Sequence, residues 1–272
     1  MPTLRTGDVE LHYEDTGAGA PVLLLHGLGS SAADWAPQIE VLAPRYRVIA
    51  LDARGSGRSR DLVHPAGPFS VKQFAADAAA LLDHLGAAPA HVVGLSMGGM
   101  IAFQLAVDSP RHVRSLCIVN SGPHLVARHP REHLALGIRR VLAAVLTPKQ
   151  MGEFLAPRLF PDEGHEELRS QFKERIADNE PAAYRATFRA LVGWSVADRI
   201  GEITAPTLVV ASDLDYTPVS AKEEYARQMP NAELVVIKGA HHAVPVEVPG
   251  EFNTILLAFL ARQGEGHASA AG

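Results

Sequence analysis

Residues 92–100 read VVGLSMGGM, and this short stretch decides how the rest of the sequence is interpreted. The apolar residues before the serine indicate a buried strand, and those after it indicate a helix. Ser96 lies between Gly94 and Gly98, so the stretch fits the pattern G-x-S-x-G. Such a turn is tight and strained, and it lifts the serine side chain clear of the sheet. The hydroxyl then lies at the positive end of a helix, where backbone N–H groups stabilise a developing oxyanion.

Strand and helix patterns alternate through most of the chain, after an expected hairpin at 3–16. Strand-like runs at 22–27, 46–52, 91–96 and 113–121 alternate with helix-like segments at 31–43, 71–86 and 97–110. The alternation lapses from about 123 to 200, where the sequence is helix-like and rich in proline, and it resumes at Pro206. This order predicts an α/β fold with a mostly parallel, twisted sheet, helices on both faces and a helical cap insertion.

The same pattern predicts the division of the chain into parts. We expect residues 1–122 and 201–263 to form the core and residues 123–200 to form the cap. Residues 264–272 have no periodicity, and we expect a disordered tail there.

Composition excludes several classes of protein. Hydrophobic residues make up 47% of the 272 residues, which is enough to bury a large core in one domain. The formal net charge of −5 and the absence of basic clusters argue against a nucleic-acid partner. The sequence has no apolar run long enough for a membrane span and no apolar signal core near its start. One cysteine, Cys117, lies in the apolar run LCIV, so we expect a small buried residue and a cytoplasmic protein.

A serine hydroxyl is a weak nucleophile unless a base and an orienting acid accompany it. Two histidines, His241 and His242, follow the last strand, and two acids, Asp213 and Asp215, follow the strand before it. The carboxyl ends of parallel strands lie at one edge of the sheet, so these side chains can converge on Ser96. The order along the chain is serine, acid, histidine, and the residues leave open which acid and which histidine take part.

The sequence resembles the α/β-hydrolase fold enzymes over nearly its whole length. The matching stretches are LLLHGLGS, LDARGSGRS, GLSMGGM, APTLVVASDLDYTP and GAHHAVPVEVPGEF, in the family's order. The nucleophile stretch also resembles those of 3-oxoadipate enol-lactonases and related small esterases and lactonases. The resemblance implies that Ser96 is the nucleophile, Asp215 the acid and His242 the base. Asp213 stays the alternative acid, and His241, which stands where the family has glycine, the alternative base.

The resemblance also implies two backbone donors for the oxyanion hole. One is the N–H of Met97, directly after the nucleophile, and the other is the N–H of Leu28, after the His26-Gly27 pair. His26 is expected to hold this loop by hydrogen bonds. The family loop that contains Asp52, Arg54, Gly55 and Gly57 is read as structural.

The expected reaction is the hydrolysis of a small ester or lactone without a cofactor or metal. The cap is expected to supply apolar residues of an acyl pocket, including Phe154, Leu155, Phe160, Leu191 and Trp194. Its apolar character favours a short-to-medium acyl ester or a lactone, including enol-lactones and N-acyl-homoserine lactones. A perhydrolase or a carbon–carbon bond hydrolase uses similar parts and is the alternative. Activity is expected to rise as the imidazole loses its proton, near pH 6.5–7 by the usual value of about 6.5.

The same sequence permits three alternative hypotheses. HGLGSSA at 26–32 fits G-x-G-x-x-A, and Asp52 follows at the distance typical of dinucleotide binding, which suggests a nicotinamide-dependent oxidoreductase. A non-catalytic ligand binder of the same fold is the second rival. His129 and His133 have metal-ligand spacing, but Pro130 stands where the H-E-x-x-H pattern needs glutamate. The first two leave the serine, acid and histidine unexplained, so the hydrolase is preferred.

Overall fold

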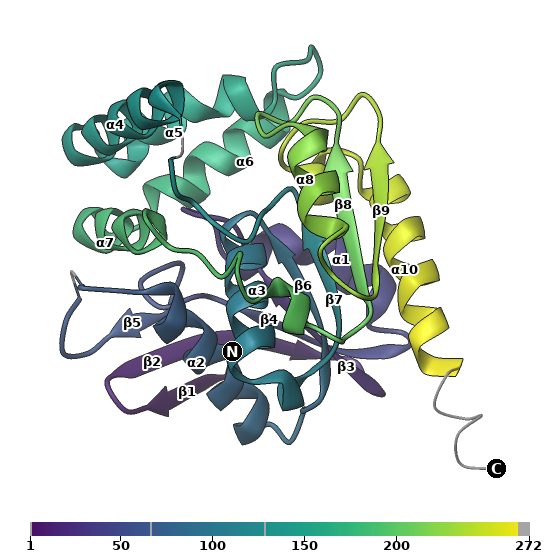
Figure 1. Cartoon of the computed structure of the whole chain (residues 1–272). Helices are drawn as coiled ribbons and strands as arrows, with labels where there is room; N and C mark the ends of the chain where they lie inside the picture. The colour runs from purple at the N-terminus through teal and green to yellow at the C-terminus, as the bar shows by residue number, and fades with distance from the viewer. Residues whose placement is uncertain (1, 66, 128, 266–272) are drawn as a thin grey trace.

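The fold is built on one twisted sheet, seen here in a computed structural model that describes residues 2–65, 67–127 and 129–265. Nine strands are found in these ranges, and the neighbour order is β1-β2-β4-β3-β6-β7-β8-β9, with β5 paired to β2 (Figure 1). Their bounds are β1 (Thr3–Thr6), β2 (Val9–Thr16), β3 (Ala20–Leu25), β4 (Tyr46–Leu51), β5 (Arg60–Asp61), β6 (Ala90–Leu95), β7 (Val113–Val119), β8 (Thr207–Ser212) and β9 (Ala232–Ile237).

The sheet is mostly parallel, as the alternation of strands and helices predicts. The pairs β3–β4, β3–β6, β6–β7, β7–β8 and β8–β9 are parallel, and β2 pairs antiparallel with β1, β4 and β5. The expected hairpin is formed by β1 and β2, with Gly7 at φ +54° in its turn, a backbone conformation that glycine adopts without strain. All parallel strands therefore end at one edge of the sheet.

Helices cover both faces because successive strand residues point to opposite sides. Leu23 and Leu25 pack in one apolar cluster with residues of α2 and α3, while Val22 and Leu24 pack in the other with residues of α1 and α10. Both faces of the sheet are therefore buried, as the continuous apolar runs of its central strands require. The helices of the core are α1 (Ala36–Leu42), α2 (Val71–His84), α3 (Met97–Asp108), α8 (Val219–Ala226), α9 (Val244–Glu247) and α10 (Pro249–Glu265).

Four further helices fill the expected insertion between β7 and β8. These inserted helices are α4 (Pro130–Val145), α5 (Pro148–Leu159), α6 (Glu166–Ala177) and α7 (Pro181–Leu191). Three of them begin with a proline, which fits the first helical position because its N–H would have no partner there. Figure 1 shows them together beyond the sheet, on the side towards which β8 and β9 run.

A few details differ from the sequence-based expectations. The helix expected at 31–43 is divided into a 3-10 turn (Ala32–Trp35) and α1, with Pro37 in the first turn of α1, where it is tolerated. The tail was expected from residue 264, but α10 continues to Glu265; residues 266–272 lie outside the described residues. Cys117 is buried, as expected. None of the helices in the described part combines the length and apolar character needed to cross a membrane.

Candidate active site

Ser96 lies at the sharp turn between β6 and α3. Its backbone has φ 54° and ψ −113°, a region that non-glycine residues occupy only under strain. The two flanking glycines are required, because a Cβ on Gly94 would overlap the carbonyl of Gly98 and a Cβ on Gly98 would overlap the carbonyl of Leu25. The turn therefore has the geometry that the pattern G-x-S-x-G predicts.

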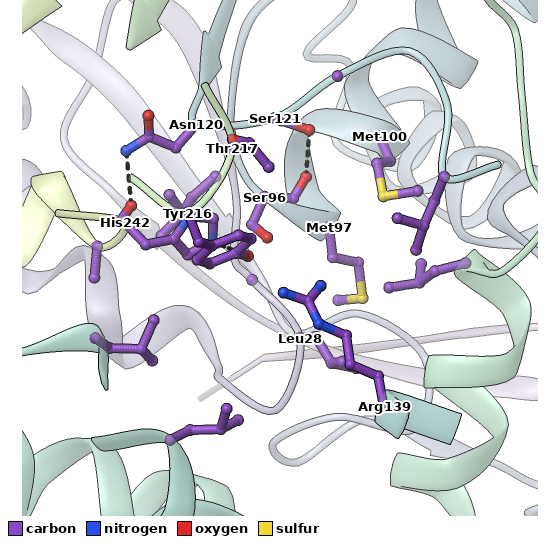
Figure 2. Close-up of a pocket in the computed structure, with 18 of the residues that line it drawn as sticks. Leu28, Ser96, Met97, Met100, Asn120, Ser121, Arg139, Tyr216, Thr217 and His242 are labelled. Carbon is purple, nitrogen blue, oxygen red and sulfur yellow. Dashed lines mark hydrogen bonds between the residues drawn. The ribbon is translucent and has the colours of Figure 1, made fainter. Parts of the chain in front are cut away.

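Hydrogen bonds from neighbouring elements hold this turn in place. The Ser96 N–H donates to the Val119 carbonyl at 3.0 Å, which continues the pairing with β7. The Ser96 carbonyl accepts from Ser121 Oγ at 2.6 Å, drawn in Figure 2, and from the Met100 N–H at 3.1 Å. The side chain of Ser96 is the one part of this residue left to face the pocket.

The structure brings His242 and Asp215 together. His242 Nδ1 lies 2.8 Å from Asp215 Oδ1, and the Asp215 side chain is fully buried. An ionised carboxylate can only accept, so the proton of the neutral imidazole is on Nδ1 and Nε2 is an acceptor. Burial raises the pKa of Asp215, but hydrogen bonds and charge from His242 and Lys222 outweigh this effect and lower it to about 2.

The two alternative residues have other partners. Asp213 Oδ1 accepts from the Gly239 N–H at 2.7 Å, which ties the loop after β8 to the loop after β9. His241 Nδ1 lies 2.6 Å from Glu247 Oε1, and the His241 N–H donates to Glu247 Oε2 at 2.7 Å. The geometry therefore groups Asp215 with His242 and leaves Asp213 and His241 to hold loops.

Asn120, which the sequence analysis did not select, fixes the ends of three strands relative to one another. It follows β7 in a left-handed conformation at φ 41°. Its Nδ2 donates to Ser212 Oγ at 2.7 Å and to the carbonyl of His242 at 2.9 Å, the bond drawn in Figure 2. Its Oδ1 accepts from the Ser212 N–H at 2.9 Å. In the sequence, Asn120 follows two apolar strand residues and precedes a serine. This context does not match a known motif, so the role of Asn120 could not be predicted.

Tyr216 is a second residue that sequence reasoning missed. Its hydroxyl lies 2.9 Å from His242 Nε2, and its ring lies against the imidazole with centroids 4.3 Å apart. The residue is 53% exposed, and this surface lines the cavity. Desolvation of the phenol hydroxyl and the charge of Asp215 raise the pKa of Tyr216 to about 12, against the lowering effects of Arg139 and of a side-chain hydrogen bond with Ser96. The phenol therefore lies between the serine and the imidazole, which form no direct hydrogen bond in the described structure.

The loop with the expected oxyanion donors lies beside Ser96. A Cβ on Gly27 would lie 3.7 Å from Ser96 Cβ, and both Leu28 and Met97 line the same pocket (Figure 2). His26 holds this loop as expected: Nδ1 lies 2.7 Å from the Gly27 carbonyl and Nε2 accepts from the Ala53 N–H at 3.0 Å. The arrangement can offer backbone N–H groups to an oxygen near Ser96.

A cavity of about 1260 Å³ connects these residues with the inserted helices. Ser96, Tyr216 and His242 line it from the core, and Phe154 and Phe160 line it from α5 and the residue after it. Trp194 does not line it, which corrects the expectation from sequence. The reason is that the indole Nε1 donates to Gln104 Oε1 at 2.7 Å, which turns the ring onto α3.

Residues considered for other ligands have structural partners. Asp52 Oδ1 accepts from the Ala32 N–H at 2.7 Å, and Oδ2 accepts from the Arg58 N–H at 2.9 Å. Both oxygens therefore bind loop backbone, which argues against a role in binding the ribose of a dinucleotide. Within the described ranges, one group of three side chains lies close enough together to hold a metal ion: Asp162, His241 and Glu247. Two of these three are already hydrogen-bonded to each other.

Comparisons with known proteins agree on the family. Residues 20–248 match the family model described as the alpha/beta hydrolase fold. A relative from Azorhizobium caulinodans, named "Putative carbamate hydrolase RutD", is 34% identical over 95% of this chain and 98% of its own length. A thermophilic esterase from Thermogutta terrifontis is 30% identical over 94% of both chains, with a TM-score of 0.84.

A second solved structure, Est816, is described as an N-acyl homoserine lactone degrading enzyme. It is 32% identical over 95% of this chain and all of its own, with a TM-score of 0.78. The match to the family model covers far more than half of the sequence and includes the strained serine turn and the loops after β8 and β9. The chain belongs to the alpha/beta hydrolase fold family of hydrolases.

Proposed function

We propose that the protein is a serine hydrolase that cleaves carboxylic esters or lactones through an acyl-enzyme intermediate. Ser96 is the nucleophile, His242 the base and Asp215 the acid. The observation that carries the proposal is the 2.8 Å hydrogen bond from His242 Nδ1 to Asp215 Oδ1, at a pocket whose wall also holds the strained Ser96. Such a bond fixes the tautomer that leaves Nε2 able to accept a proton.

The proposed reaction follows from these positions. Ser96 Oγ attacks the carbonyl carbon while its proton passes to His242 Nε2, and the N–H groups of Leu28 and Met97 donate to the oxyanion. The imidazolium gives the proton to the leaving alkoxide, and an acyl ester remains on Ser96. Water then attacks this ester with the same base, releases the acid and restores the serine. In a lactone the alkoxide stays part of the acyl group, and no cofactor is required.

The position of Tyr216 adds a step to this sequence. Its hydroxyl occupies His242 Nε2 in the structure, so the phenol must turn away before Nε2 takes the serine proton. Tyr216 is 53% exposed and lines the cavity, so an entering substrate can displace its side chain. We propose that substrate binding completes the contact between Ser96 and His242.

We further propose that the inserted helices act as a cap that selects the acyl group, and that residues 1–122 and 201–263 form the catalytic core. The support is that α5 and its flanking residue contribute Phe154 and Phe160 to the same cavity as Ser96. Apolar walls hold an acyl chain and leave the few polar groups to orient the carbonyl. This favours a short-to-medium acyl ester or a lactone.

Carbamates are the second candidate substrate class, because relatives of this chain carry the name of carbamate hydrolase. A carbamate presents a carbonyl that Ser96 can attack in the same way. It differs from a carboxylic ester in that a nitrogen, instead of a carbon, is attached to the carbonyl carbon. A direct comparison of turnover therefore separates the two substrate classes.

The test is a substrate panel with matched variants. The panel holds p-nitrophenyl esters of increasing chain length, simple and N-acyl-homoserine lactones, and a carbamate. We expect turnover of esters or lactones that Ser96→Ala lowers by up to about 10⁶ in kcat. Ser109→Ala, at the far end of α3, is the control and keeps full activity. No turnover by the wild type, or undiminished turnover by Ser96→Ala, contradicts the proposal.

A further inference from the structure

Lys222 is a buried cation beside the proposed acid. It lies on α8, and only 1% of it is exposed. Its Nζ lies 2.5 Å from Asp215 Oδ2, 2.7 Å from the Thr217 carbonyl oxygen and 2.5 Å from Thr217 Oγ1. The three ammonium protons therefore have three acceptors, two on Thr217 and one on Asp215.

Such an arrangement has a cost that calls for an explanation. Lysine is almost never fully buried unless paired, because taking a charge out of water is unfavourable until pairing offsets it. Tyr225 and Ala226 on α8, and Met229 just after it, are buried and belong to the apolar core. An apolar residue at 222 would fit this face, so packing does not require the ammonium group.

The two oxygens of Asp215 have separate tasks. Oδ1 pairs with His242 Nδ1 at 2.8 Å, while Oδ2 pairs with Lys222 and with the hydroxyl of Thr217. The Lys222 contact prevents rotation of the carboxylate and keeps Oδ1 towards the imidazole. It also gives the carboxylate a permanent counter-charge, whereas the imidazole supplies one only when protonated.

We propose that Lys222 is a positioning residue of the reaction: it fixes the Asp215 carboxylate and, by sharing its charge, limits how strongly Asp215 stabilises the protonated His242. The inference rests on the triad proposed above. Its consequence is that His242 becomes a neutral base at a lower pH than it would with Asp215 alone.

Other titratable groups near the pair come from several elements. They are Tyr216 on the same loop, Arg139 on α4, Tyr225 on α8, Asp213 after β8, and His241 with Glu247 after β9. Arg139 Cζ lies 5.0 Å from the Tyr216 ring centroid. A substitution at 222 leaves all of them in place, so a change in pH dependence reports the loss of the Lys222 charge.

The first experiment measures kcat/KM against pH for Lys222→Met. We expect the midpoint of the acidic limb to move up by about one pH unit. The substitution removes a positive charge that disfavours the imidazolium, and a nearby charge shifts such equilibria by on the order of one unit. Arg227→Met, which removes an exposed cation from the end of the same helix, is the control and keeps the wild-type midpoint. A folded Lys222→Met with an unshifted or lowered midpoint overturns the proposal, even if its melting temperature falls.

The second experiment stands independently of how well Lys222→Met folds. Asp215→Asn is compared with Asp215→Asn/Lys222→Met, in which the buried pair is removed as a whole. If Lys222 acts through Asp215, the two variants have kcat values within about twofold, because coupled residues are not additive. A further tenfold loss in the double variant would show that Lys222 acts independently of Asp215, and the proposal would fail.

A fluorophosphonate titration separates this inference from the proposed function. The reagent reacts with an activated serine, and mass spectrometry locates the adduct. A wild type whose Ser96 is not labelled contradicts the proposed function and the role of Lys222 with it. If Ser96 of the wild type is labelled and the pH midpoint of Lys222→Met is unshifted, only the proposed role of Lys222 is contradicted.

Discussion

The α/β core and the inserted helices differ in how closely their residues pack. In the core, the serine turn accepts no Cβ at Gly94 or Gly98, because backbone atoms fill the space. On α4, by contrast, Leu134 and Val145 are 66% and 73% exposed. Side chains in close-packed surroundings have one position, whereas loosely packed ones tolerate replacement. The difference agrees with the proposal that the core carries the chemistry and the inserted helices select the substrate.

The strongest way to break this comparison is in the core, at the two acids after β8. We expect Asp215→Asn to lower kcat by about 10⁴, because an amide in place of the carboxylate favours the wrong imidazole tautomer. Asp213→Asn should keep kcat within about tenfold, since Asp213 accepts only from the Gly239 N–H in the described structure. Steady-state kinetics on the best ester or lactone checks both. The reverse ranking would move the acid to Asp213.

The second effect is on stability and again belongs to the core. The pKa of Asp215 is lowered to about 2, below the unfolded value of about 3.9. A lowered pKa stabilises the fold above the unfolded value, and this contribution is lost as the pH falls from about 4 towards 2. It amounts to roughly 2–3 kcal/mol. Urea unfolding at pH 7, 5, 4 and 3 should show the wild-type advantage over Asp215→Asn shrinking over the last steps.

A gap between the two proteins that stays constant down to pH 3 would contradict the buried ionised carboxylate. Titrating groups that do not contact Asp215 are common to both proteins and cancel in the difference. His242 and Lys222 contact Asp215, so the change between pH 4 and pH 3 is the part that reports the carboxylate.

The core was predictable from sequence because its signals are local. Apolar runs, glycine spacing and strand-end positions predict the α/β fold and bring Ser96 together with two acids and two histidines as candidates. The family resemblance then selects Asp215 and His242, which the structure places in contact. Lys222 was within reach of the same reasoning, because it shares the spacing of the buried face with Tyr225, Ala226 and Met229. A lysine in a sequence favours a solvated helix face, since lysine is rarely buried, so its charge hides this position.

The contacts that sequence reasoning missed depend on side-chain directions in three dimensions. Tyr216 reaches His242 Nε2 because the loop after β8 folds back over the imidazole, and Asn120 meets Ser212 and His242 across neighbouring strands. Trp194 was assigned to the pocket from its apolar character alone. A tryptophan needs a partner for its N–H when buried, and Gln104 on α3 provides it.

The inserted helices offer a smaller, more selective effect. Phe154 lines the cavity, so we expect Phe154→Ala to change the ratio of kcat/KM between long and short acyl esters by about tenfold. Leu134→Ala, on the exposed side of α4 and outside this cavity, is the matched control and should keep the ratio. An equal loss on every ester would mean that the residue supports the chemistry and would weaken the contrast between the two regions.

The smallest expected effect is at Trp194, which belongs to the insertion in sequence but contacts the core. Trp194→Phe removes the bond from Nε1 to Gln104 Oε1, so we expect a loss of about 1 kcal/mol in the free energy of unfolding. The preference among acyl chain lengths should not change, because the ring does not line the cavity. Denaturant titration and the ester series measure the two quantities on the same sample. A changed preference with unchanged stability would mean that Trp194 lines the acyl pocket after all. The residues that select the substrate would then extend closer to α3 than the hydrogen bond to Gln104 indicates.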